Sequence, residues 1–338
     1  MRRPLFVLLL LPALALAPGF VARRAMASDI IDATGRTVQV PDHVARVLPA
    51  GGPAAVLLEA LAPDLMLGWP TPLPTEKRAL LAPEAATLPN VPHLAGLHAT
   101  GYGNTLDAIR ALNPDLILDY GTVSPDYIAL ARSTQERSGI ATVLLDGRLA
   151  ETPRVLRLLG AALHREQRAE TLARLAEALL AVPPVPGKPP RVAYVRGTDM
   201  LKLAAPGTGA TEVFTRLGWQ VVAPPGDGWF RVTTQDAIAA FDPDIVVFSD
   251  AGMRAVVAAS PAWRALRAVR DGHAYIEPAS PFGWINEPPS LNQVLGVAWL
   301  AGGDAATLAA TFSAVVYGHV LTADDVRAVA DTAKPLRP

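Results

Sequence analysis

The sequence contains no cysteine. Disulfides, thiolate metal sites and cysteine nucleophiles are therefore excluded, as is a lipid-anchoring cysteine behind a leader peptide. The chain also lacks any cluster of Lys or Arg in its body, and its 30 basic and 31 acidic residues give a formal net charge of -1. This balance argues against nucleic acid or an anionic membrane surface as the main partner. We expect the chain to bind a small molecule or a protein.

Long apolar runs are missing too. Residues 1–27 carry Arg2 and Arg3, then an apolar run from Leu5 to Ala17, with small-residue cleavage sites ending at Ala17 or Ala27. This pattern is typical of a signal peptide, because the run is shorter than the roughly 20 residues that a membrane span needs. We expect export to a periplasm, cleavage of the leader and a soluble mature protein.

Common catalytic and nucleotide-binding signatures are absent. Gly101-Tyr102-Gly103 and Gly207-Thr208-Gly209 lack the third glycine of a dinucleotide fingerprint. There is no phosphate-binding P-loop, no G-x-S-x-G and no H-E-x-x-H. An exported α/β enzyme is therefore only a remote alternative, and we expect a protein without catalytic activity.

One short unit occurs twice. LDAIRALNPDLILDY at residues 106–120 returns 129 residues later as QDAIAAFDPDIVVFS at residues 235–249, with six of fifteen positions identical. Each copy reads as an amphipathic helix, an Asn/Asp-Pro-Asp break and a short apolar strand. The repeat predicts two similar lobes.

The remaining pattern alternates strands and helices, which predicts α/β lobes with mostly parallel sheets. IIDATGRTVQVP reads as a hairpin turned at Gly35. Residues 152–182 show unbroken helical spacing behind Pro153, which predicts one connecting helix of about 45 Å. We expect a signal peptide at 1–27, an N-terminal lobe at 28–150, the connecting helix at 151–183 and a C-terminal lobe at 184–338.

Large aromatic residues lie in predicted loops beside Gly or Pro. Tyr102 and Trp229 precede the two repeat copies, and Tyr120 follows a strand at the sheet end where α/β proteins bind ligands. Such rings in a cleft suit a large, partly flat ligand, and a nearby arginine could answer its negative charge. The alternative is packing between domains. The candidate ligand contacts are Tyr102, Tyr120, Arg196, Trp229, Arg231 and Trp284, with Trp69 a weaker one.

Two carboxylates recur at the start of the repeat helices. Asp107 and Asp236 are expected in the first helical turn, where the helix dipole favours negative charge. Ordinary helix-end charge would explain either alone. Their recurrence also suggests a pair of acidic docking points for a two-fold partner.

The histidines give little support for a bare metal site. Of the six, only His93 and His98 lie close together in the sequence, and a divalent cation needs several ligands to converge. A receptor for free Zn or Mn using His93 or His98 is kept as an alternative.

Taken together, the leader, the two α/β lobes, the connecting helix and the repeat resemble the periplasmic binding proteins of ABC importers for iron-siderophores, haem and cobalamin. The resemblance covers nearly the whole mature chain. It rests on DATGRTVQVP, NTLDAIRALNPDLIL, VTTQDAIAAFDPDIVVF and PFGWINEPPSLNQVLGVAWL.

The resemblance implies a class III binding-protein fold, with a metal chelate held between the lobes and no intrinsic cofactor. It also implies an ABC permease dimer as the partner, docked by acidic residues that match Asp107 and Asp236, and a monomeric receptor. The family usually has glutamate at the docking positions. Its siderophore binders often have an arginine in the loop that here reads HATGYGN, which leaves haem, cobalamin, a neutral chelate or another metal complex as candidate ligands.

Overall fold

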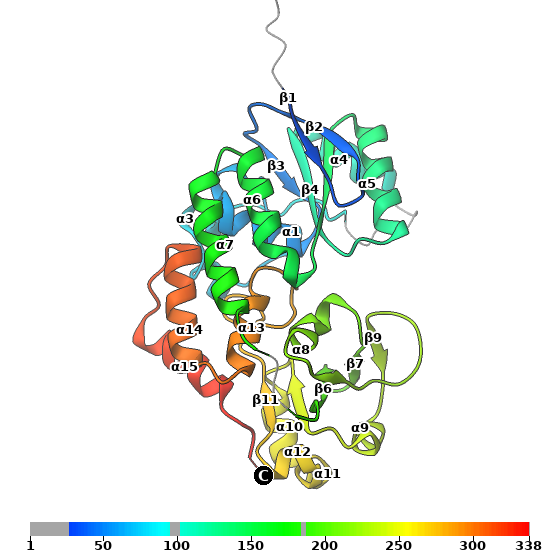
Figure 1. Ribbon diagram of the computed structural model, residues 1–338, viewed down its shortest axis with the longest axis vertical. Helices are drawn as coiled ribbons and strands as arrows, with labels where there is room; N and C mark the ends of the chain where they lie inside the picture. The colour runs from blue at the N-terminus through cyan, green and yellow to red at the C-terminus, as the bar shows by residue number, and fades with distance from the viewer. Residues whose placement is uncertain (1–26, 95–101, 184–186, 338) are drawn as a thin grey trace, which may run out of the picture.

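The computed structural model describes residues 27–94, 102–183 and 187–337. His98 and the predicted signal peptide, apart from its last residue Ala27, lie outside these residues. Within the three described ranges, no helix combines the length and apolar character needed to cross a membrane. The chain folds into two lobes, with a row of C-terminal helices along one side of both (Figure 1).

The N-terminal lobe opens with the predicted hairpin. β1 (Ala27–Ile31) pairs antiparallel with β2 (Thr37–Pro41), and Gly35 has the positive φ of 79° that its tight turn requires. Asp32 holds the turn by accepting from the backbone of Thr34 at 2.9 Å. The hairpin is therefore confirmed.

Behind it, β3 (Val47–Pro49), β4 (Leu116–Gly121) and β5 (Ala141–Asp146) form a parallel sheet. These strands are nearly all buried, as expected for a parallel sheet covered on both faces. The helical segments of this lobe are α1 (Gly52–Leu61), η1 (Pro63–Leu65), α2 (Thr75–Arg78), α3 (Pro83–Ala86), α4 (Tyr102–Ala111), α5 (Pro125–Ser138) and η2 (Leu149–Glu151).

The C-terminal lobe has a larger, mixed sheet. β6 (Arg191–Arg196), β10 (Ile245–Phe248) and β11 (Ala274–Ile276) run parallel, and β8 (Gln220–Val221) joins β6 in parallel. β7 (Lys202–Ala204) and β9 (Phe230–Val232) add an antiparallel edge. Its shorter helices are η3 (Gly209–Thr211), α8 (Glu212–Arg216), α9 (Gln235–Phe241), α10 (Met253–Ala259), α11 (Pro261–Ala265) and α12 (Arg267–Arg270). The predicted α/β class with mostly parallel sheets is confirmed.

The predicted unbroken helix over 152–182 is wrong. The chain forms α6 (Thr152–Ala162) and α7 (Glu166–Leu180), which pack against each other. Between them His164 has a φ of 53°, a left-handed conformation that no α-helix continues through. The apolar spacing on both sides is regular, so periodicity alone concealed the break. α7 by itself, about 22 Å long, runs from the upper lobe toward the lower one (Figure 1).

The last helices tie the lobes together. α13 (Gln293–Leu300), α14 (Ala305–Phe312), the π-helix η4 (Ser313–Tyr317) and α15 (Ala323–Ala333) continue from the C-terminal lobe. η4 packs on α1, and Arg168 of α7 donates to the carbonyls of Ala60 at 2.9 Å and Val315 at 2.6 Å. The tail of the predicted C-terminal lobe therefore packs on the N-terminal one, and a single apolar core extends through both.

The two repeat copies adopt the predicted helix-then-strand form. The first covers α4 and β4, and the second covers α9 and β10. A left-handed residue follows each helix, Asn113 with φ 45° two residues after the end of α4 and Asp242 with φ 42° directly after α9. After the proline, Asp115 accepts from the backbone nitrogens of Ala45 and Arg46, and Asp244 accepts from Arg191 at 2.8 Å. Each break thus fixes the entry to the neighbouring strand.

Candidate functional site

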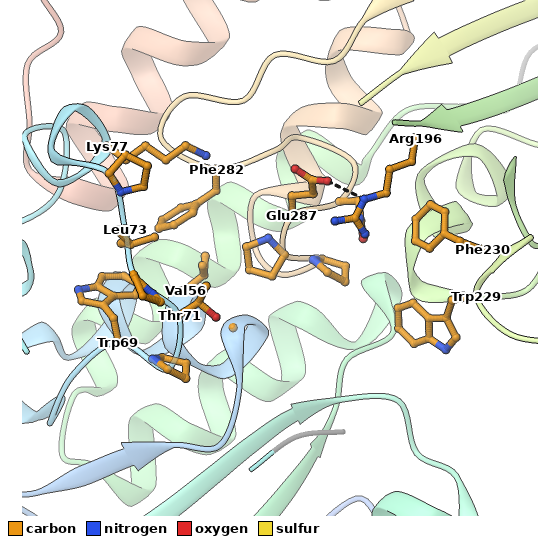
Figure 2. A pocket seen from close by; sticks show the side chains of 17 residues that line it. Val56, Trp69, Thr71, Leu73, Lys77, Arg196, Trp229, Phe230, Phe282 and Glu287 are labelled. Carbon is orange, nitrogen blue, oxygen red and sulfur yellow. Dashed lines mark ion pairs between the residues drawn. The ribbon is translucent and has the colours of Figure 1, made fainter. Parts of the chain in front are cut away.

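A cavity of about 570 Å³ lies between the lobes. The N-terminal lobe contributes α1, the proline-rich loop from Trp69 to Pro74 and Lys77 of α2. The C-terminal lobe contributes Arg196, at the carboxyl end of β6, with residues 229–230, 282 and 286–289. Figure 2 shows Trp69 and Lys77 on one side and Arg196, Phe230 and Trp229 on the other. This is the sheet end at which α/β proteins usually bind ligands.

A second cavity, of about 520 Å³, adjoins the first. The two share Trp229 and Pro289, but the second is lined by Asp146, Arg148 and Glu212 with glycine-rich turns. The ring of Trp229 lies so close to Gly209 that a Cβ there would be 3.1 Å from its Cη2 atom. Trp229, which is 36% exposed, therefore stands as a partition between an aromatic and an acidic half of one cleft.

The aromatic half is backed by rings that are fixed in place. Trp69 is 2% exposed, and its Nε1 donates to the carbonyl of Ala85 at 2.9 Å. Phe282 lies against it with ring centroids 5.9 Å apart. Because contacts within the protein hold both rings, they form a fixed apolar wall of the cavity.

Three charged side chains face this aromatic half. Arg196 lies over the ring of Phe230, with its Cζ atom 5.3 Å from the ring centroid, and its Nε is 3.1 Å from Oε1 of Glu287. Lys77 stands across the cleft on the other lobe. The aromatic half therefore combines apolar rings with two cations and one anion.

The wall that carries Glu287 rests on a buried carboxyl group. Glu277 follows β11 and accepts from Tyr194 Oη at 2.5 Å and from the backbone of Ile285 and Asn286 at 2.6 and 3.0 Å. Burial raises the pKa of Glu277 to about 7, although these hydrogen bonds act in the opposite direction. The group thus braces the loop from Phe282 to Pro289.

Two of the predicted ligand contacts, Arg196 and Trp229, do line the cleft. Arg231 does not line either half, which corrects the expectation. Neighbouring residues of a strand point to opposite faces, so Phe230 faces the cleft and Arg231 turns away, where its Nη1 donates to the carbonyl of Pro224.

Tyr120 and Trp284 are core residues rather than cleft residues, which is a second correction. Tyr120 is 2% exposed and its hydroxyl lies 3.1 Å from Oγ1 of Thr152. Trp284 is fully buried and packs edge-to-face on Trp299. Position beside a loop did not distinguish a ring that enters the cleft from one that fills the core beneath it.

Tyr102 begins α4, but its side chain is outside the description. His93 is an exposed residue of its loop. The surrounding protein nevertheless shields part of its ring from water, and this desolvation lowers its pKa. Among the described residues, no three His, Asp or Glu side chains come together as a metal site would require.

The predicted docking residues are both exposed, one on each lobe, and α4 and α9 lie toward the same edge of the molecule (Figure 1). Asp236 is in the first turn of α9, as predicted. Asp107 is not in the first turn of α4, because that helix already begins at Tyr102. Asp107 also pairs with Arg110 at 2.6 Å.

Sequence reasoning missed Lys77, Phe230, Phe282 and Glu287. Available signals were the prolines that surround them, in PTPLP before Lys77 and in the EPP that contains Glu287, since prolines stiffen loops at little entropic cost.

Another hollow, of about 430 Å³, lies at the opposite end of the C-terminal sheet and is lined by Trp219, Tyr275 and Trp299.

Comparison with known proteins places this cleft in context. The family model described as periplasmic binding protein matches residues 74–281. No protein of curated function is similar enough in sequence to match the chain.

Several solved structures share the fold. A solute-binding protein of an ABC transporter from Sulfurospirillum deleyianum is 20% identical, covers 90% of this chain and 99% of its own, and superposes with a TM-score of 0.77. The molybdate-binding protein of Haemophilus influenzae is 17% identical, covers 87% of this chain and 99% of its own, and superposes with a TM-score of 0.64. The vitamin B12-binding protein of Vibrio cholerae is 17% identical, covers 76% of this chain and 95% of its own, and superposes with a TM-score of 0.57. These likenesses establish the class III binding-protein fold.

Proposed function

Because the chain belongs to the periplasmic binding protein family, we propose that it is the solute-binding component of an ABC importer that captures a metal chelate between its lobes. The observation that carries this proposal is the preformed interlobe cavity of about 570 Å³, walled by Trp69, Phe282 and Trp229. A cavity of this size with aromatic walls and few polar groups fits a compact organic ligand. Binding without turnover is the proposed role.

The proposed ligand class is an iron or other metal chelate with a flat or apolar body, such as an iron-siderophore, haem or a cobalamin-like molecule. Similar solved proteins bind molybdate and vitamin B12. A chelate brings its own metal ligands, which agrees with a cleft that exposes rings, an arginine and a lysine. A free Zn or Mn ion would need converging histidines or carboxylates, and the described part of the chain, which does not include His98, shows no such group.

Delivery is proposed to occur at an ABC permease dimer in the inner membrane, after export of the chain to the periplasm. Asp107 and Asp236 are exposed acidic residues on the two lobes. A two-fold permease that presents basic pockets would meet one carboxylate from each lobe. A single receptor monomer suffices for this contact.

Native mass spectrometry of the protein isolated from its own periplasm tests the proposal. We expect an added mass that matches a metal chelate, which disappears on unfolding and returns on refolding with the extract. Trp229→Leu should reduce occupancy, whereas the control Arg231→Gln, two residues further along the chain but outside both halves of the cleft, should keep it. A receptor loaded with a bare cation, or one that is always empty, would contradict the proposal.

A further inference from the structure

Arg196 is placed in the cleft with its hydrogen-bonding capacity unused. An arginine has five N–H donors, and within the described part of the chain none of those of Arg196 meets an acceptor with hydrogen-bond geometry. Glu287 approaches to 3.1 Å, as a charge contact only. The paired N–H groups of the guanidinium therefore stay available to a planar anion, which they bind in a bidentate manner.

The guanidinium is nevertheless held in position. It belongs to the last residue of β6, a central strand of the lobe, and it lies over the face of Phe230. This cation–π contact attracts the guanidinium to the ring without using its N–H donors. The ring and Glu287 together hold the guanidinium toward the cleft.

Glu287 is held against it by a rigid loop. Its backbone has a φ of 70°, a left-handed conformation that costs a residue with a side chain about 1 kcal/mol or more. The flanking contacts maintain it: Ser290 Oγ donates to the carbonyl of Pro53 at 2.8 Å, and Asn292 Nδ2 donates to that of Pro288 at 3.0 Å. The fold therefore maintains a strained backbone that places a carboxylate beside Arg196, as Figure 2 shows.

We propose that Arg196 makes the receptor select a carboxylate-bearing ligand over a neutral one of the same shape, and that Glu287 is a built-in competitor for the ligand's anionic group, which limits this preference. The inference rests on the proposed ligand-binding function of the cleft. A neutral ligand of that shape gains little from the N–H donors of Arg196, because it offers them no charged acceptor. A carboxylate satisfies these donors, and Glu287, whose side chain is 40% exposed, turns toward solvent.

Two small probes of equal shape test this without knowledge of the natural chelate. 2-Naphthoate and 2-naphthamide share the ring system and differ in charge, and their binding can be followed on the indole N–H signal of Trp229 by NMR titration. We expect wild-type protein to bind the naphthoate about tenfold more tightly than the amide, the value of one charge-assisted hydrogen bond.

The variants assign this preference to the pair. Arg196→Gln should weaken naphthoate binding about tenfold and leave the amide unchanged, because it removes the charged donors. Glu287→Gln should strengthen naphthoate binding a few-fold, because it removes the competitor and keeps the shape. Arg231→Gln is the control, because it removes a cation of the same lobe that lines neither half of the cleft, and it should have little effect. Circular dichroism melting curves confirm that each variant is folded.

Equal binding of the two probes, no saturable shift with the naphthoate, or a larger loss from Arg231→Gln than from Arg196→Gln would overturn the proposal. So would weaker naphthoate binding to Glu287→Gln. Failure of the proposed transport function has a separate signature, since it would leave the native receptor without a chelate while the charge preference of the cleft persisted.

Discussion

The two lobes contain the same three-strand parallel unit, β3-β4-β5 in one and β6-β10-β11 in the other. Their resemblance is closest at the entry to the strands. Arg46 directly precedes β3, and Arg191 is the first residue of β6. The backbone nitrogen of each donates to a carboxylate of the Asn/Asp-Pro-Asp break, and each side chain donates to a carbonyl at the end of the repeat helix. The residues that the two repeat copies share therefore fix the point at which the neighbouring strand begins.

The lobes differ at the opposite end of the same strands, where the cleft lies. Asp146 ends β5 beside Arg148, and although burial acts to raise its pKa, the hydrogen bonds and charge of Arg148 keep it below the usual range. Glu277 follows β11 without a cationic partner, and burial raises its pKa to about 7. The fold is thus repeated where it supports the sheet and has diverged where a ligand would be recognised.

The largest loss of transport is expected from changing the two docking aspartates, and it tests whether both lobes contact the permease. Asp107→Lys with Asp236→Lys should abolish uptake and leave ligand affinity unchanged, because both side chains are exposed and remote from the cleft lining. Asp236→Lys alone should be the more damaging single change, since Asp107 is already neutralised by Arg110. Transport assays and binding titrations measure the two quantities.

Asp324→Lys is the matched control for this experiment, because Asp324 is exposed and pairs with Arg327 three residues on, as Asp107 does with Arg110. Normal transport by the double variant would remove the docking assignment.

The next prediction concerns the pH dependence of stability that arises from Glu277 and Asp146, whose pKa values are shifted in opposite directions. Because the folded-state pKa of Glu277 is raised, stability should fall as pH increases from about 4.5 to about 7, and Glu277→Gln should remove up to about 3 kcal/mol of that fall. Asp146 has a lowered pKa, so its contribution is present above about pH 4 and is lost as the solution is acidified.

Urea unfolding between pH 3 and pH 8 measures both contributions. Asp146→Asn should alter only the acidic limb of the profile, and Glu277→Gln only the limb toward neutral pH. Identical pH profiles for the two variants would contradict the difference between the lobes.

A smaller loss of stability is expected when the aspartate after the proline is removed from the Asn/Asp-Pro-Asp break of each repeat copy. Asp115→Ala and Asp244→Ala should each lower the free energy of unfolding by about 1 kcal/mol, because each leaves backbone N–H groups without their acceptor. Asp244→Ala should cost more, as it also removes the pairing with Arg267 at 2.9 Å. The corresponding Asn variants keep an acceptor oxygen and should lose less. If the Asn and Ala variants were equally destabilised, the hydrogen bonds would not be the cause.

The smallest effect is the expected hinge motion. One apolar core extends through both lobes, and Ser290 and Arg168 hydrogen-bond across their junction. X-ray scattering should therefore show a change in radius of gyration of less than about 1 Å between the apo and loaded protein. A clear compaction on loading would show that the lobes move as separate bodies.

Much of the architecture was predictable because it follows from periodicity. The hairpin, the repeat copies and the alternating strands and helices are local patterns of apolar spacing and turn residues. The break at His164 was not predictable in this way, because apolar spacing is the same on both sides of it. It depends on the tertiary packing of α6 on α7.

The candidate site was less predictable for a similar reason. Trp229 and Trp284 are both tryptophans in proline-rich loops, yet one faces the cleft and the other is fully buried. Glu287 carries no sequence signal of its own, since its role depends on a left-handed backbone and on Arg196 from another strand. Side-chain direction and contacts distant in sequence decide such cases.

A crystal structure of the protein loaded with its copurified ligand would show which cavity binds the chelate. We predict a chelate between the Trp69 wall and Trp229, with an anionic group on the guanidinium of Arg196 and the side chain of Glu287 turned away. A ligand bound instead in the hollow beside Trp219 and Tyr275, with the interlobe cleft unchanged, would contradict it.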